Sequence, residues 1–125
     1  MSVSIASSVK SYPRHNYAIM AEDILGKRYD VSLVFVGTKR AQSLNIQYRN
    51  KSYTPNVLSF PLSNEQGEIY ICPSAAKAQA KDFTMSEREY IAFLFIHGCL
   101  HLKGHTHGAT MEKAEQRYFK KYFRR

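Results

Sequence analysis

Three histidines in the last third of the chain have the types and spacing of a metal site. His97 and His101 are four residues apart, so both imidazoles lie on one face of a helix. Gly104 follows three residues later and lets the chain turn back, which brings His107 towards the same point. Three neutral imidazoles bind zinc at about 2.0–2.1 Å and leave a fourth position open to water, as catalytic sites do. We therefore predict one divalent metal ion, Zn²⁺ by default, held by His97, His101 and His107.

The residue after the first histidine argues against peptide hydrolysis. Zinc peptidases with two histidines at this spacing carry a glutamate there as general base, whereas this chain has Gly98. Cys99 is not expected to bind the metal, because two residues along a helix turn a side chain about 200° away from His97. His105 lies in the turn close to His107, and we predict a substrate-side or surface position for it rather than a ligand role.

Length and composition set the class of protein. A chain of 125 residues is predicted to form one domain, residues 1–125, around one hydrophobic core. With 44% hydrophobic and 22% charged residues, the composition is that of a globular protein, and no run of about 18 apolar residues predicts a membrane span. Residues 1–10 lack the features of a signal peptide. We therefore expect a cytoplasmic protein with no membrane partner.

A strong positive charge indicates a polyanionic partner. The formal net charge is +8 at pH 7, and Lys and Arg that neutralise phosphates release counterions, which supplies much of the affinity for nucleic acid. A basic surface that only keeps the protein soluble explains the same charge, so this feature alone does not decide. Much of the charge lies near the end of the chain, at Lys113, Arg117, Lys120, Lys121, Arg124 and Arg125.

The elements that must position these residues alternate along the chain. Apolar spacing and turn residues predict strands at residues 2–6, 31–36, 57–60 and 68–72. The same signals predict helices from Pro13 to Gly26, from a cap at Thr38 to about Arg49, from Pro73 to about Asp82, from Ser86 to Gly104, and from about Thr110 to Phe123. Pro61 is expected to stop the third strand.

The inner faces of these helices follow from three- and four-residue intervals. In the second helix the inward positions are predicted to be Ala41, Leu44, Asn45 and Tyr48, and in the last helix Met111, Ala114, Tyr118 and Tyr122. Ser86 and Glu89 form a capping box that opens a long apolar helix, which we expect to be central and buried. The predicted fold is α+β, or mixed α/β: a small mixed sheet of about four strands packed with about five helices. The metal site lies on the long helix and the turn after it.

Three blocks of this sequence resemble one known family. The run from His97 to His107 has the histidines, glycines and leucines at the spacing that marks the YbeY-type endoribonucleases, the bacterial ribosomal RNA maturation factors. Residues 44–51 and 54–61 look like a second conserved stretch of that family, and residues 67–72 look like a third. The resemblance covers about residues 31–110, with the blocks in the same order.

Two positions depart from the family's pattern. The family usually has aspartate just before the last histidine, where this chain has Thr106, and aspartate in the third block, where it has Glu68. Neither change removes a ligand. Thr106 lacks a carboxylate that could orient an imidazole, and Glu68 extends its carboxylate by one methylene group.

The resemblance implies metal-dependent hydrolysis of single-stranded RNA during ribosomal RNA maturation, with processing of the 3′ end of 16S rRNA, and in ribosome quality control. Ribosomal subunits or assembly factors are then candidate partners beside the RNA itself. The chemistry of the site agrees, because a metal held by three histidines can activate water and polarise the scissile phosphate through its open position. A glutamate base is not essential, since the metal lowers the pKa of its water to about 7.

Further site residues come from the second block. Arg49 matches an arginine that the family uses for activity, and its planar fork could clamp two phosphate oxygens; a surface arginine at a helix carboxyl end is the alternative. Lys51 is a weaker phosphate contact or a solvated loop residue. A groove that holds unpaired bases could be lined by Asn45, Tyr48, Asn56 and Ser59. A core position for Tyr48 and a turn-shaping role for Asn56 are equally open.

Two other functions are kept as alternatives. One is a ribosome-assembly factor that binds RNA without cutting it and in which zinc is structural. The other is a zinc peptidase, which the histidine spacing favours and Gly98 opposes.

Overall fold

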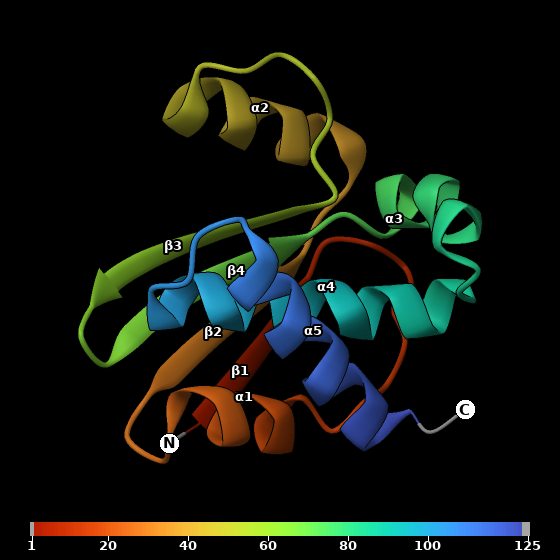
Figure 1. Cartoon of the computed structure of the whole chain (residues 1–125). Helices are drawn as coiled ribbons and strands as arrows, with labels where there is room; N and C mark the ends of the chain where they lie inside the picture. The colour runs from red at the N-terminus through yellow and green to blue at the C-terminus, as the bar shows by residue number, and fades with distance from the viewer. Residues whose placement is uncertain (1, 124–125) are drawn as a thin grey trace.

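A computed structural model describes residues 2–123, and it contains the four strands and five helices that the sequence predicts (Figure 1). The strands are β1 (Ser2–Ser7), β2 (Asp30–Phe35), β3 (Val57–Ser63) and β4 (Gln66–Ile71). The helices are α1 (Tyr17–Leu25), α2 (Thr38–Arg49), α3 (Pro73–Ala80), α4 (Glu87–Lys103) and α5 (Ala109–Tyr122), with a short 3₁₀ helix, η1 (Lys81–Phe83), after α3.

The four strands form one mixed sheet in the order β1-β2-β4-β3. β1, β2 and β4 are parallel, and β3 runs antiparallel to β4 at the edge. Alternate residues of β2 point into the main core, so Val31, Leu33 and Phe35 are buried while the residues between them are partly exposed. This period of two is what a strand with one covered face requires. The predicted α+β architecture is confirmed.

One face of the sheet is covered by α1, α4 and α5, which lie on the same side of it in Figure 1. α4 is the central helix of this layer. Its buried residues surround most of its circumference, from Ile91 to Leu102, as expected for a helix packed between a sheet and other helices. The predicted capping box is present, since Ser86 accepts from the Glu89 amide and Glu89 accepts from the Ser86 amide. α4 is therefore a rigid support for its histidines.

α2 lies apart from this layer, at the top of Figure 1. It is anchored by a separate small cluster in which Ala41 packs with Val36 and Cys72. Asn45 is fully buried on the same helix and donates from Nδ2 to the Tyr53 carbonyl at 3.0 Å. These contacts fix the carboxyl end of α2, where Arg49 lies.

Three predicted boundaries are wrong. The first helix begins at Tyr17 rather than at Pro13, because the Asn16 side chain caps it by accepting from the Ile19 amide. Thr38 is the first residue of α2 and not its cap; Gly37 holds that position without a side-chain hydrogen bond. β3 continues past Pro61, because it is an edge strand whose ladder is already irregular between Pro61 and Ser63. An edge or bulge position tolerates a proline without a backbone N–H.

Other expectations needed smaller corrections. The α-helix after Pro73 ends at Ala80, and η1 continues the turn to Phe83. Tyr48 is not on the inner face of α2, since 60% of it is exposed. In α5, Met111 and Ala114 are buried as predicted, but Glu115 and Phe119 are the other buried residues. Tyr118 and Tyr122 only cover the edge of the core.

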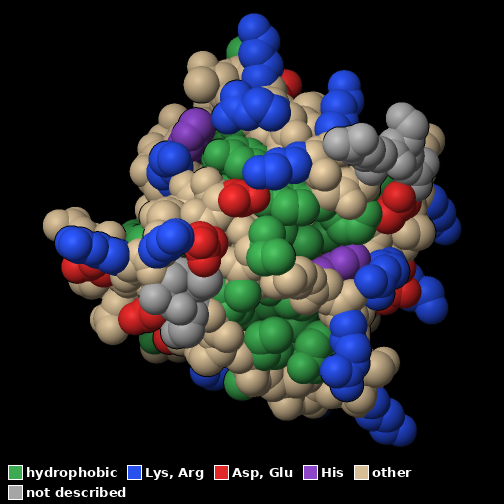
Figure 2. Space-filling model, turned by 90° about the horizontal axis from the view of Figure 1, so that it is seen from below, with side chains coloured by type: hydrophobic (Ala, Val, Ile, Leu, Met, Phe, Trp, Pro, Cys, Tyr) green, Lys and Arg blue, Asp and Glu red, His purple; other side chains and the backbone are tan. Residues whose placement is uncertain are grey.

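The surface of the described residues is basic without one dominant cationic patch on the face seen from below. Figure 2 shows Lys and Arg side chains around the rim of this face and hydrophobic side chains gathered in its middle. None of the helices among residues 2–123 is long and apolar enough to cross a membrane.

Candidate metal centre and its pocket

The three predicted ligands converge. His97 and His101 come from the last turns of α4, and His107 comes from the turn that follows the left-handed Gly104. One ligand nitrogen of each ring lies within 4.8 Å of those of the other two. The Nε2 atoms of His97 and His101 are 3.1 Å apart. His97 and His101 are partly buried and His107 is exposed, so the cluster is open on one side.

Hydrogen bonds to the far sides of two rings prepare them to bind a cation. Nδ1–H of His97 donates to the carboxylate of Glu115, and Nδ1–H of His101 donates to the His105 carbonyl at 3.1 Å. Both partners only accept, so in the neutral rings the protons must be on Nδ1 and the lone pairs on Nε2. Two such lone pairs facing each other at 3.1 Å repel unless a cation lies between them. The donor set therefore fits a divalent metal.

Glu115 is the site residue that sequence reasoning missed. It is a buried carboxylate on α5, with 7% of the residue exposed. A signal was present, because Glu115 follows Ala114 on the predicted inner face of a helix, and a buried acid there needs a partner. Together with the His105 carbonyl, Glu115 provides the acceptors that Thr106 does not provide.

The surroundings of His101 keep its ring neutral. Burial lowers the pKa of His101 below its ordinary value, and the neighbouring imidazole of His97 lowers it further, whereas the hydrogen bond to the His105 carbonyl raises it. Only the neutral ring has a lone pair for a metal, so this direction favours metal binding at neutral pH.

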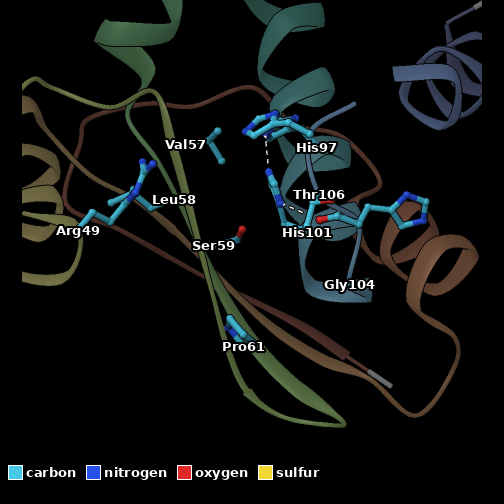
Figure 3. Close-up of a pocket in the computed structure, with 11 residues that line it drawn as sticks. Arg49, Val57, Leu58, Ser59, Pro61, His97, His101, Gly104 and Thr106 are labelled. Atoms are coloured by element: carbon cyan, nitrogen blue, oxygen red, sulfur yellow. Dashed lines mark hydrogen bonds between the residues drawn. The ribbon is translucent and has the colours of Figure 1, made fainter. Parts of the chain in front are cut away.

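A pocket of about 490 Å³ opens beside the three histidines. Its other residues are Arg49, Val57, Leu58, Ser59, Pro61, Gly104, His105 and Thr106. Figure 3 shows Arg49 approaching from α2, and His97 and His101 from α4, with β3 running between them. No acidic residue lines this pocket. Its charged groups thus suit an anion such as a phosphodiester.

The side chain of Arg49 is oriented by two neighbours. One terminal nitrogen, Nη1, donates to the Tyr53 hydroxyl at 3.3 Å and lies 3.5 Å from the Asn45 Oδ1 atom. Asn45 is itself held by the Tyr53 carbonyl. These contacts leave the other nitrogens of the guanidinium free to donate to a ligand. Asn45 positions Arg49 and does not line the pocket.

The remaining predicted groove residues lie in different places. Ser59 lines the pocket. Asn56 lies in an adjoining pocket, where its amide donates to the Tyr90 hydroxyl at 3.1 Å. Lys51 and Tyr48 line neither pocket, and the ring of Tyr48 packs against Phe60 with centroids 5.3 Å apart.

The residues between His97 and His107 are explained by how they pack. Gly98 faces the sheet, and a Cβ atom at this position would lie 3.0 Å from Cδ1 of Ile69. A glutamate at this position would therefore point at Ile69 and not into the pocket. Cys99 is fully buried, as expected for a thiol turned away from the metal. His105 lines the pocket without belonging to the three-histidine cluster.

Comparison with known proteins places this arrangement in a family. The sequence profile of the family described as "Endoribonuclease YbeY" matches residues 4–122. The chain belongs to this family. The Mesoplasma florum protein named Endoribonuclease YbeY is 37% identical over 106 residues, which are 76% of this chain and 62% of that protein. The Campylobacter jejuni protein of the same name, from strain 81-176, is 43% identical over 96 residues, or 70% of this chain and 72% of that protein.

The chain is shorter than several of these YbeY relatives. It spans about three fifths of the length of the Mesoplasma florum and Bdellovibrio bacteriovorus proteins. Among solved structures, the solution structure of TM1509 from Thermotoga maritima matches with a TM-score of 0.70 at 26% identity. The match covers 97% of this chain and 89% of that one, so the two folds correspond over nearly the whole length of this chain.

Proposed function

We propose that this protein is a metal-dependent endoribonuclease that cuts single-stranded RNA. The observation that carries the proposal is the pocket itself, where three convergent imidazoles and one oriented guanidinium face the same space. The family supports the same activity, since its relatives are named endoribonucleases.

His97, His101 and His107 would hold the metal, with Zn²⁺ as the default for three imidazoles. A divalent ion held there supplies Lewis acidity towards a phosphate oxygen and towards a water molecule. Glu115 and the His105 carbonyl keep His97 and His101 turned towards the ion.

The chain's own residues would position the phosphodiester. Arg49 offers a planar fork that binds two oxygens of one phosphate and neutralises charge as the bond breaks. Ser59 presents a hydroxyl to the same pocket from β3. The β3 residues Val57 and Leu58 make part of the pocket wall apolar.

The finer function follows from the family resemblance. We propose ribosomal RNA as the substrate, with maturation of the 16S rRNA 3′ end and ribosome quality control as the processes and the cytoplasm as the location. Ribosomal subunits or assembly factors are the proposed partners. The net charge of +8 is consistent with an RNA partner.

Cleavage of a labelled single-stranded RNA by the metal-loaded protein tests this function. Activity should disappear on chelation, return with added Zn²⁺, and be absent from a His101→Ala variant. A duplex of the same sequence should be cut more slowly. Unchanged cleavage in the chelator or in the variant would rule out the metal-centred mechanism.

Chelation of the metal also separates the enzyme from an assembly factor with structural zinc, if the fold is measured beside cleavage. The cores that hold α4 and α2 consist of apolar side chains and do not include the three histidines. We therefore expect the chelated protein to stay folded by circular dichroism. Unfolding on chelation, together with RNA binding but no cleavage by the metal-loaded protein, would support the structural role.

A further inference from the structure

A second pocket, of about 660 Å³, adjoins the metal centre. The two pockets share Val57, His97 and His107, so they meet at the histidines. Arg49 lines the first pocket and is absent from the second. A ligand with a phosphate at the histidines would therefore have the second pocket directly beside it.

The second pocket is aromatic. Its rings come from η1, α4 and α5, and they are Phe83, Tyr90, Phe93 and Phe119. Phe83 stacks on Tyr90 with centroids 5.1 Å apart at 18°, and Tyr90 lies nearly parallel to Phe93 at 6.2 Å and 11°. Phe83 is 51% exposed, so one of these rings is available to a ligand. Flat apolar ligands stack on such surfaces.

The ring of Tyr90 is held in place by polar contacts at its edge. The Tyr90 hydroxyl accepts from Asn56 at 3.1 Å and donates to the Gln79 side chain at 3.3 Å. Burial raises the pKa of Tyr90, so the hydroxyl stays protonated and keeps these bonds at neutral pH. The ring of Tyr90, on which Phe83 stacks, is therefore oriented without a ligand, which lowers the entropy cost of binding.

The charges of the two pockets differ. Among residues 2–123, no Lys or Arg lines the aromatic pocket, whereas Glu112 and Glu115 do. A phosphate is repelled by these carboxylates, but an uncharged nucleobase is not. The polar rim, which includes Gln116, offers hydrogen bonds to a base edge.

Basic residues lie beside the aromatic pocket, along α5. Glu112 and Gln116 also border a third hollow, whose basic residues are Lys113, Arg117 and Lys120 of α5. The aromatic pocket thus adjoins the histidine pocket through Val57, His97 and His107, and it adjoins the basic hollow of α5 through Glu112 and Gln116. This alternation suits phosphate, base and phosphate of one strand.

From this arrangement we propose that the aromatic pocket binds one unpaired nucleobase of the RNA strand held at the histidines, while the following backbone runs along Lys113, Arg117 and Lys120. The inference rests on the proposed function, because it takes RNA as the ligand. It adds the subsite that would make the enzyme select single strands: a paired base stacked in a duplex cannot enter the pocket.

Binding of charge-matched strands tests the base pocket. The metal-loaded protein is mixed with a fluorescent oligoadenylate of about ten nucleotides, or with the same sugar–phosphate strand carrying stable abasic residues, and anisotropy is read within seconds. Wild type should bind the base-bearing strand more tightly. Phe83→Ala should weaken that binding about 5- to 100-fold and leave the abasic strand unchanged. Leu62→Ala, which removes a similarly exposed apolar side chain of β3 outside the pockets, should change neither.

A second pair of variants tests the backbone path. The slope of the logarithm of the binding constant against the logarithm of the salt concentration measures the number of phosphate contacts. In the double variant Lys113→Ala with Arg117→Ala, the magnitude of this slope should fall by about 0.7 per lost phosphate contact. Lys27→Ala with Arg28→Ala removes the same charge between α1 and β2 and should leave the slope nearly unchanged.

Each outcome decides a separate claim. The base pocket would be overturned if wild type bound the base-bearing and abasic strands with equal affinity. It would also be overturned if Phe83→Ala and Leu62→Ala lost the same affinity. Either result would hold even if the RNA is cut, and the aromatic surface would then serve another partner. Base-selective binding without any cleavage would support the pocket and contradict the nuclease function.

Discussion

The imidazole of His97 on α4 donates its Nδ1–H to the carboxylate of Glu115 on α5. This bond joins the metal centre to the helix that also borders the aromatic pocket. It fixes both the tautomer and the orientation of the His97 ring, so the geometry of the three-histidine cluster depends on how α5 packs against α4.

Replacing Glu115 should weaken metal binding more than it weakens the fold. Glu115→Ala is expected to lower zinc affinity about 10- to 100-fold, and Glu115→Gln less, because its amide oxygen still accepts from Nδ1–H. Competition with a fluorescent chelator measures the affinity. Glu65→Gln, which removes a carboxylate from the β3–β4 turn, is the control. An affinity of Glu115→Ala equal to that of wild type would show that the bond does not support the ligand.

Replacing Arg49 should remove cleavage and spare the metal. Arg49→Ala is expected to lower kcat about 10²- to 10³-fold, as loss of one preorganised donor does, with a full equivalent of zinc retained. Arg49→Lys should recover only part of the rate, because a point charge lacks the planar fork. Arg40→Ala removes the same charge from the exposed side of α2 and should cut RNA like wild type. Zinc loss in Arg49→Ala would contradict the clamp.

Gly98 should be required for the close approach of α4 to the sheet. In Gly98→Ala the new Cβ atom would lie 3.0 Å from Cδ1 and 3.1 Å from Cγ2 of Ile69. Overpacking of this kind is expected to lower the free energy of unfolding by about 1–3 kcal/mol, as urea denaturation can measure. Ile69→Val removes Cδ1 and should restore part of the loss in the double variant. Additive losses in the double variant would show that Ile69 is not the obstacle.

The stability of the metal-loaded protein should fall as the pH drops through about 6.5, in part because of His15. Burial lowers the pKa of His15, although its bond to the Arg88 carbonyl raises it. As the pH falls below the ordinary pKa of about 6.5, the unfolded chain takes up a proton at His15 while the native state keeps this ring neutral. The free energy of unfolding therefore decreases until the pH reaches the lowered pKa of the native state, below which both states are protonated. His15→Gln keeps a donor for the carbonyl and removes the titration. Urea denaturation between pH 7 and 5 should show a smaller loss for this variant, and an identical pH slope would exclude His15 as a cause.

Much of the site could be predicted because its information is local. His97 and His101 share a face through the helical period, and Gly104 ends the helix where a left-handed residue is needed to bring His107 back. The capping box at Ser86 fixed the start of that helix. The strand and helix signals likewise gave the α+β class, since each depends on spacing within a few residues.

The tertiary structure alone decided which distant residues meet. Glu115 reaches His97 because α5 packs on α4, and the aromatic pocket forms because η1, α4 and α5 converge there. Tyr48 is exposed because α2 lies apart from the main helix layer. Pro61 stays within a strand because β3 is at the sheet edge, where a missing N–H costs no ladder bond. The sequence by itself determined the three-histidine cluster and the elements that carry it, because helix and strand periods act over short range. Tertiary packing determined which residues these histidines contact and what shape the pockets have. Those contacts join segments that are far apart in the sequence, so no spacing along the chain predicts them.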